Sequence, residues 1–220
     1  MSEPTPYDKS FADAATQDSL RSARKIVPYL IAKYDPRSVV DVGCCLGAWL
    51  SVFASSRVPI TGIDGAYVDQ SQLLIKPEEF IALDLESQEL PSRRYDMALC
   101  IEVAEHLTPE AGRRTIGWLC KHADVVVWSA AIPGQGGTNH INEQWPSIWR
   151  KEFKQRGFVP SYALRELFWD DRDVGFCVRQ NILVYAAFMD EPWGPIDVVH
   201  PDFFHFKLNG WGSTAFRGLK

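Results

Sequence analysis

The chain has 220 residues, of which 46% are hydrophobic and 23% charged, as expected for a globular domain with a buried core. Its formal net charge of -5 disfavours nucleic acid as a partner, because binding to phosphates depends on clustered Lys and Arg. The five cysteines form no CxxC pair, which argues against a disulfide scaffold and a cysteine zinc site. We expect all five to be reduced thiols.

The sequence shows no targeting segment and no membrane span. Residues 1–19 are polar and lack the apolar stretch of a signal peptide. The longest apolar runs, such as 125–132, are too short to cross a bilayer. We therefore expect a cytoplasmic protein with no membrane association.

Helical and strand patterns alternate through the first two thirds of the chain. Apolar residues recur at helical spacing from about Thr16 to Tyr34, and Pro36 marks the end of this helix. Short apolar runs then predict strands, and the intervening patterns predict helices. The expected strands are 38–42, 58–63, 80–83, 95–101 and 124–130, and the expected helices are 46–55 and 109–121.

A Gly-rich loop at 133–145 precedes the last third of the chain. We expect a helix over 146–156 and then two late strands, 158–169 and 176–187, paired as an antiparallel hairpin. Because strands and helices alternate, we expect an α/β, Rossmann-like fold: a largely parallel seven-stranded sheet with helices on both faces and a late antiparallel strand. The predicted organisation is an N-terminal helical segment at 1–36, a cofactor-binding domain at 37–189 and an aromatic, Pro- and Gly-rich tail at 190–220.

Candidate ligand-binding residues directly follow the predicted strands, where ligands bind in sheets of this kind. A turn from Asp41 to Gly47 follows the first strand, and Asp64 ends the second, where a carboxylate can accept hydrogen bonds from ribose hydroxyls. Asp41 would repel a pyrophosphate, but it suits the ammonium and sulfonium of S-adenosylmethionine (SAM). The pattern therefore favours SAM over a dinucleotide.

With these residues, the sequence resembles the class I SAM-dependent methyltransferases over residues 38–187. In that family the first motif is an acidic residue followed by G-x-G-x-G, and here Cys45 stands in place of the middle glycine. The resemblance also implies a role near the adenine for Asp84, although a helix cap or surface acid would equally explain this residue. The cofactor-binding residues implied are Asp41, Gly43, Cys45, Gly47, Asp64, Asp84, Leu85 and Glu102.

On the acceptor side, residues 101–107 resemble the E-V-x-E-H stretch of small-molecule methyltransferases, and His140 lies in the loop after the fifth strand. Three interpretations are open. His106 or His140 is a general base; or Glu102, Glu105, His106 and His140 hold a divalent metal, a pattern similar to the small-RNA 3′-terminal 2′-O-methyltransferases; or these residues only shape the pocket. The acidic chain disfavours the RNA version, but a small diol remains compatible with a metal.

We expect an O-methyltransferase that acts on a small hydroxylated metabolite or sugar, with His106, His140 and Glu102 as catalytic residues and no metal. One rival, a nicotinamide-dependent oxidoreductase, requires a G-x-G-x-x-G spacing that the chain lacks. Another rival is a non-catalytic SAM-binding module, which Cys45 favours and the intact 102–106 segment opposes. The tail at 190–220 has three possible uses: to cap the site, to pack on the domain or to form a homodimer.

Overall fold

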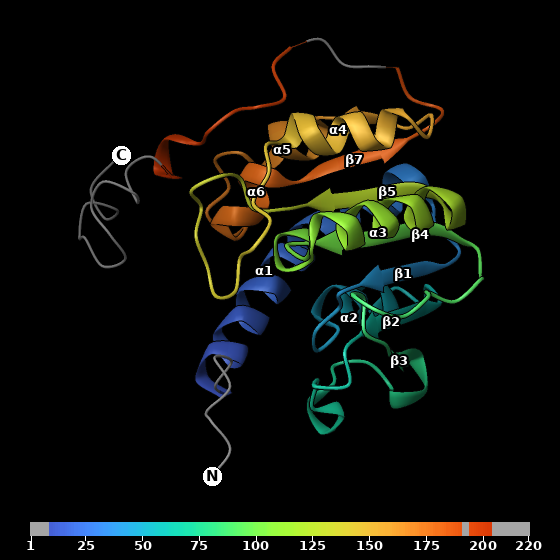
Figure 1. The fold of residues 1–220 in the computed structure, drawn as a ribbon. Helices are drawn as coiled ribbons and strands as arrows, with labels where there is room; N and C mark the ends of the chain where they lie inside the picture. Colours follow the sequence, from blue (N-terminus) through green and yellow to red (C-terminus); the bar gives the residue numbers. More distant parts are fainter. Residues whose placement is uncertain (1–8, 191–193, 204–220) are drawn as a thin grey trace.

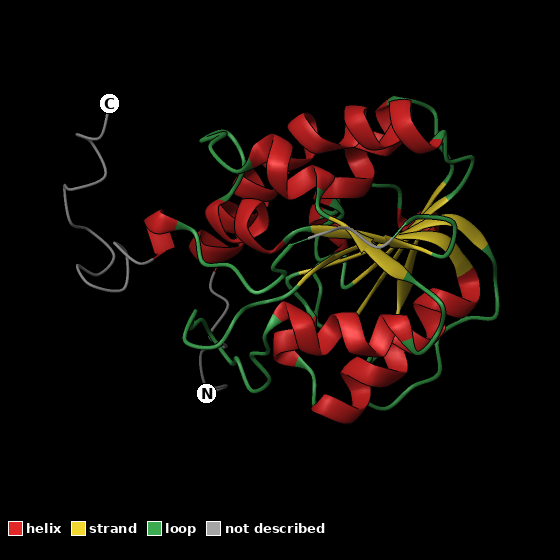
Figure 2. Cartoon of the chain, turned by 90° about the horizontal axis from the view of Figure 1, so that it is seen from above, coloured by secondary structure: helices red, strands yellow, loops and turns green. Residues whose placement is uncertain are grey.

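A computed structural model describes residues 9–190 and 194–203, in which helices cover both faces of a seven-stranded sheet (Figures 1 and 2). The strand order is β3-β2-β1-β4-β5-β7-β6. The strands are β1 (Val39–Val42), β2 (Ile60–Asp64), β3 (Phe80–Ala82), β4 (Tyr95–Ile101), β5 (Ala123–Ser129), β6 (Val159–Ser161) and β7 (Leu183–Ala186).

Strands β1 to β5 are parallel, whereas β7 runs antiparallel to both β5 and β6. This confirms the predicted fold class. After β1 the chain moves outward to β2 and β3, then returns to place β4 on the other side of β1. The order therefore reverses between β1 and β4, and a ligand site is expected beyond their carboxyl ends.

The helices divide between the two faces of the sheet (Figure 2). One face carries α1, α2, α5 and α6, and the other carries α3 and α4. Their bounds are α1 (Lys9–Tyr34), α2 (Ala48–Ser55), α3 (Pro109–His122), α4 (Pro146–Lys154), α5 (Ala163–Phe168) and α6 (Phe176–Asn181).

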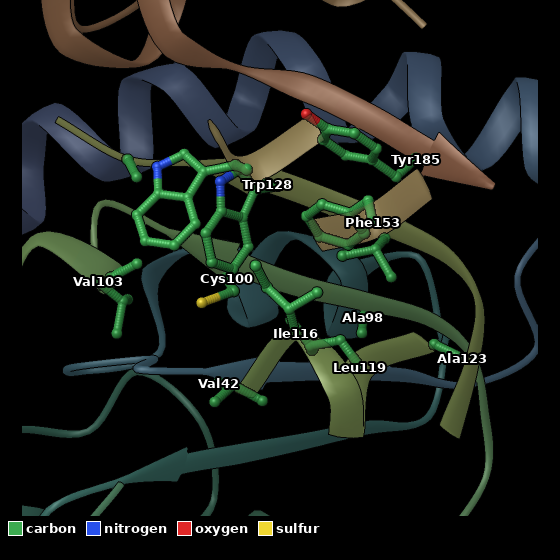
Figure 3. Close-up of a cluster of buried hydrophobic side chains, with 14 of the residues drawn as sticks. Val42, Ala98, Cys100, Val103, Ile116, Leu119, Ala123, Trp128, Phe153 and Tyr185 are labelled. Carbon is green, nitrogen blue, oxygen red and sulfur yellow. The ribbon is translucent and has the colours of Figure 1, made fainter. Parts of the chain in front are cut away.

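Alternate residues of the strands face the two helical layers, so both faces are apolar and buried. In β4, Met97 packs toward the α1 and α2 layer, whereas Ala98 packs toward α3. Figure 3 shows the α3 and α4 side, where Trp128 of β5 and Tyr185 of β7 surround Phe153 of α4. The rings of Phe153 and Tyr185 are stacked with centroids 3.9 Å apart. This packing holds α4 against β5, whose carboxyl end lies at the site, and against β7.

The predicted hairpin of two long late strands is wrong. The extended segments are only β6 and β7, and α5 and α6 occupy most of the remaining residues. Packing explains the difference, because one side of each short helix is buried in the core around α1, through Leu164 in α5 and Val178 in α6. The antiparallel pairing of the two strands is confirmed.

The described part of the tail packs on the domain. Ile196 is buried against the α3 and α4 core, and Asp202 pairs with Arg179 at 2.6 Å. The rest of the predicted tail, 191–193 and 204–220, lies outside the described residues. Among the described helices, none has the length and apolarity that crossing a membrane requires.

Candidate cofactor and acceptor site

The turn between β1 and α2 strongly favours glycine at two positions. Gly43 has a φ of +85°, and a Cβ there would lie 2.3 Å from a methyl carbon of Val103. Gly47 has a φ of +78°, and a Cβ there would lie 3.0 Å from Ile75. The N–H of Gly43 donates to the carbonyl of Ile63 at 2.8 Å, which fixes the turn against β2. The two glycines therefore let the turn pack closely against Val103 and Ile75, while Cys45 between them is exposed.

Cys45 lies at the middle of this turn, in the position where the family motif has a glycine. Its φ of +50° places it in the left-handed region, which glycine adopts without strain. Its backbone N–H donates to the Asp64 carboxylate at 2.7 Å. Cys45 thus occupies a glycine-like conformation, and Asp64 helps to hold it there.

Asp64 lies at the carboxyl end of β2 and is 5% exposed. One carboxylate oxygen accepts from Cys45, and the other accepts from the N–H of Gly65 at 2.7 Å and the hydroxyl of Tyr67 at 2.5 Å. Gly65 has a structural purpose here, because a Cβ would lie 2.1 Å from the Tyr67 ring. The sequence predicted Asp64 next to the turn but gave no indication of the Tyr67 contact.

Asp41 lies near the carboxyl end of β1, and only 2% of it is exposed. Burial raises the pKa of its carboxyl to about 7, and the nearby Asp64 carboxylate adds to this effect. Two acidic groups therefore lie at the carboxyl edge of β1 and β2, a surrounding that favours a cationic ligand over a phosphate.

Asp84 and Leu85 follow β3. Asp84 is exposed, and its carboxylate accepts from the N–H of Glu86 at 3.0 Å and the hydroxyl of Ser87 at 2.5 Å. These bonds shape a local turn. Leu85 is half-buried against the α3 and α4 core. Both residues lie at the carboxyl end of β3, as predicted, and Asp84 has a structural task in the turn.

Glu102 follows β4 with a left-handed φ of +53°. Its carboxylate accepts from the hydroxyl of Ser129, from Gln135 at 2.9 Å and from Asn181 at 3.1 Å. Asn181 also donates to Gln135 at 2.9 Å. Glu102 therefore joins the ends of β4, β5 and α6. Gln135 and Asn181 were not among the predicted site residues, because their partners are distant in sequence.

Three of the four residues considered for a metal come together. Potential ligand atoms of Glu105, His106 and His140 lie within 4.8 Å of one another, and no further group of this kind is found in the described part of the chain. The two imidazole rings meet edge to face with centroids 4.8 Å apart. The loop reaches this position because the N–H groups of Ile141 and Asn142 donate to the Glu105 carbonyl at 2.8 and 3.0 Å.

The cluster is poor in hydrogen-bond partners. Glu105 is 1% exposed, and among the described residues neither of its carboxylate oxygens makes a hydrogen bond of ordinary geometry, with Glu102 and the backbone of Ala131 nearby; Nδ1 of His106 also makes none. Burial raises the pKa of Glu105 well above its ordinary value, and the Glu102 carboxylate raises it further. Burial, followed by the neighbouring His140, lowers the pKa of His106. His106 is therefore neutral at pH 7 and available to accept a proton.

Comparisons with known proteins agree with this fold. A family model described as "Methyltransferase domain" matches residues 15–181. A search of curated proteins finds no match.

Solved structures of methyltransferases have similar folds. Magnesium protoporphyrin IX methyltransferase from Synechocystis PCC 6803 with bound SAH is 17% identical, with a TM-score of 0.53 over 72% of this chain and 81% of that chain. CalS10, an amino pentose methyltransferase from Micromonospora echinaspora with bound SAM, is 15% identical, with a TM-score of 0.58 over 84% and 99%. The sugar N-methyltransferase KedS8 from Streptoalloteichus sp ATCC 53650 is 14% identical, with a TM-score of 0.59 over 84% and 97%.

Proposed function

Because the chain belongs to the methyltransferase domain family, we propose that it transfers a methyl group from SAM to a hydroxyl group of a small hydroxylated metabolite or sugar. In this reaction the bond between sulfur and the methyl carbon breaks as a bond from the acceptor oxygen forms. The products are S-adenosylhomocysteine (SAH), the methyl ether and the hydroxyl proton. The protein must orient the acceptor in line with the methyl group and supply a group that accepts the hydroxyl proton.

The cofactor assignment depends on the pairing of Asp64 with the turn at 43–47. Asp64 lies at the end of β2 against this turn, with one oxygen bonded to Cys45 and the other to Gly65 and Tyr67, where a ribose hydroxyl would compete with Tyr67. The buried Asp41 adds an acidic group where a dinucleotide would bring a phosphate. A nucleoside without phosphates and with a cationic amino-acid portion suits both features. SAM or SAH is also bound in two of the similar structures.

The histidine pair supports a hydroxyl acceptor. His106 and His140 lie edge to face beyond the ends of β4 and β5, and the lowered pKa of His106 keeps an imidazole neutral. A neutral imidazole near a hydroxyl can remove its proton as the methyl group is transferred. Two of the similar structures are described as methyltransferases of amino sugars or sugars, which supports a sugar-like acceptor.

Two measurements, made one after the other, test the proposed function. Isothermal titration of the purified protein with SAH, SAM and NAD tests the cofactor; we expect SAH and SAM to bind and NAD not to bind. Transfer of radiolabelled methyl from SAM to a panel of hydroxylated metabolites, sugars and amino sugars then tests the acceptor. His106→Gln and His140→Gln are compared with wild type on any acceptor found. The base role is wrong if both variants keep wild-type turnover, and methylation of amino groups alone would replace oxygen by nitrogen as the acceptor atom.

A second route for the proton is favoured by one observation, the unpartnered carboxylate of Glu105 beside two imidazoles. This donor set suits a divalent cation such as Mg²⁺, Mn²⁺ or Fe²⁺, which would lower the pKa of a bound hydroxyl and release its proton to water. A chelator distinguishes the routes. Turnover lost on chelation and restored by added Mn²⁺ supports the cation, whereas turnover unaffected by chelation supports a histidine base.

A further inference from the structure

We propose that Glu143 is a positioning residue, which holds His140 in the tautomer that has its hydrogen on Nδ1 and its lone pair on Nε2. The expected effect on turnover rests on the proposed function, whereas the tautomer of His140 does not. The tautomer itself can be measured without an acceptor.

The carboxylate of Glu143 contacts three other residues of the loop that carries His140. One oxygen lies 2.9 Å from Nδ1 of His140 and accepts from the N–H of Gly136 at 2.5 Å. The other oxygen accepts from the N–H of Gly134 at 2.7 Å. Both glycines have positive φ angles, +82° and +70°, which turn their N–H groups toward one carboxylate. The loop is therefore folded around the side chain of Glu143.

The direction of the bond between Glu143 and His140 follows from the charge of the carboxylate. Both carboxylate oxygens of Glu143 accept from backbone N–H groups, one from Gly134 and the other from Gly136, as expected for an ionised carboxylate. An ionised carboxylate has no hydrogen to give, so Nδ1 of His140 must be the donor. In a neutral imidazole this leaves the lone pair on Nε2.

Only 12% of the His140 side chain and 17% of the Glu143 side chain are exposed, so water competes weakly for this hydrogen bond. Gly137 makes room for the ring, because a Cβ there would lie 2.3 Å from Nε2. The lone pair on Nε2 is needed whether His140 removes a proton or binds a cation. In both cases a carboxylate behind the imidazole fixes its orientation.

Long-range ¹H–¹⁵N NMR of the histidine rings in the SAH-bound wild type tests the proposal, with the His140 signals identified by their loss in His140→Gln. We expect the Nδ1–H tautomer in wild type. We expect mixed tautomers in Glu143→Gln, because an amide presents an NH₂ group to at least one of three donors. Glu143→Asp keeps the charge and is expected to keep the tautomer. Glu110→Gln on the exposed start of α3 is the matched control.

On any acceptor found in the panel, Glu143→Gln should lower kcat about 10- to 100-fold with SAH affinity unchanged. A purely structural role would instead weaken SAH binding and lower thermal stability while leaving the His140 tautomer as in wild type, and that result would overturn the proposal. An Nε2–H tautomer in wild type would also overturn it, even if no Glu143 variant folds. The expected tautomer in a protein that methylates none of the panel would contradict the proposed function alone.

Discussion

Cys45 donates its backbone N–H to the carboxylate of Asp64 at 2.7 Å while holding a left-handed φ of +50°. This bond joins the turn after β1 to the end of β2, two segments that contribute different parts of the candidate cofactor site. Because Asp64 also accepts from Gly65, its carboxylate is fixed before any ligand arrives. If Asp64 binds the ribose as proposed, ribose recognition and the shape of the turn are coupled through one side chain.

Replacing Asp64 by asparagine should weaken SAH binding. The amide has no charge and presents an NH₂ group to one of the backbone donors. The variant therefore loses hydrogen bonds from the carboxylate both to the proposed ribose and to the turn. Hydrogen bonds to charged groups contribute about 1.5–3 kcal/mol, so we expect about a 100-fold loss of affinity by isothermal titration. Asp124→Asn, at the opposite end of β5 from the site, is the control. Unchanged affinity in Asp64→Asn would mean that the ribose binds elsewhere.

Tyr67→Phe should have the opposite effect. The Tyr67 hydroxyl donates to the Asp64 oxygen that a ribose hydroxyl would need, at 2.5 Å. Removing the hydroxyl removes this competition, which amounts to about 1 kcal/mol or a several-fold gain in SAH affinity. The same titration measures it. A loss of affinity would instead show that Tyr67 itself contacts the cofactor.

Cys45→Gly should stabilise the protein. A residue other than glycine in the left-handed region costs about 1 kcal/mol, and glycine avoids that cost but has more freedom to lose on folding. We expect the free energy of unfolding in urea to rise by about 0.5 kcal/mol with SAH affinity retained. Cys45→Ala keeps a Cβ and should show no gain. Equal behaviour of the two variants would contradict the strain argument.

The fold and the positions of the candidate cofactor residues at the carboxyl ends of the strands could be predicted from the sequence, because they depend on local patterns. The apolar run at 95–101 corresponds to β4, and Asp64 lies where a strand-end acid was expected. The hairpin prediction over 158–187 failed because apolar residues at mixed spacing fit strands and helices alike. Packing against α1 decided between them, and packing is not visible in a single sequence.

The acceptor side was only partly predictable for a different reason. The 102–106 segment and His140 were recognised as candidates, but the bonds of Glu102 to Gln135 and Asn181 join segments far apart in the chain. Glu143 was visible only as one polar residue in a Gly-rich loop. Its role depends on the φ angles of Gly134 and Gly136, which the sequence allows but does not specify.

Gly43→Ala should destabilise the protein through two separable causes. The added methyl would lie 2.3 Å from Val103, and the φ of +85° is unfavourable for alanine. We expect a loss of about 2–4 kcal/mol in urea unfolding. Val103→Ala in the same chain removes the two closest carbons, which would lie 2.3 and 2.8 Å away, but keeps the Cβ at 3.2 Å and the backbone strain. Measured against Val103→Ala alone, Gly43→Ala should therefore still be destabilising, but by less than in wild type. If Gly43→Ala cost nothing in the Val103→Ala background, the backbone conformation would carry no cost.

Asp41→Asn should change how stability depends on pH. In the folded protein burial raises the pKa of Asp41 to about 7, from a value of 3.8 for the exposed group. Between these values the folded state holds a proton that the unfolded state has released, so this group makes the free energy of unfolding fall as pH rises, until it levels off above about pH 7. The full shift corresponds to at most about 4 kcal/mol.

Asparagine does not titrate, so urea unfolding of the cofactor-free variant should lack this part of the decline between about pH 5 and about pH 8, and its stability relative to wild type should increase across that range. Parallel pH profiles for the two proteins would show that Asp41 does not titrate in this range. The same variant should bind SAM less tightly than wild type at about pH 8, where the ionised carboxylate attracts the cationic ligand.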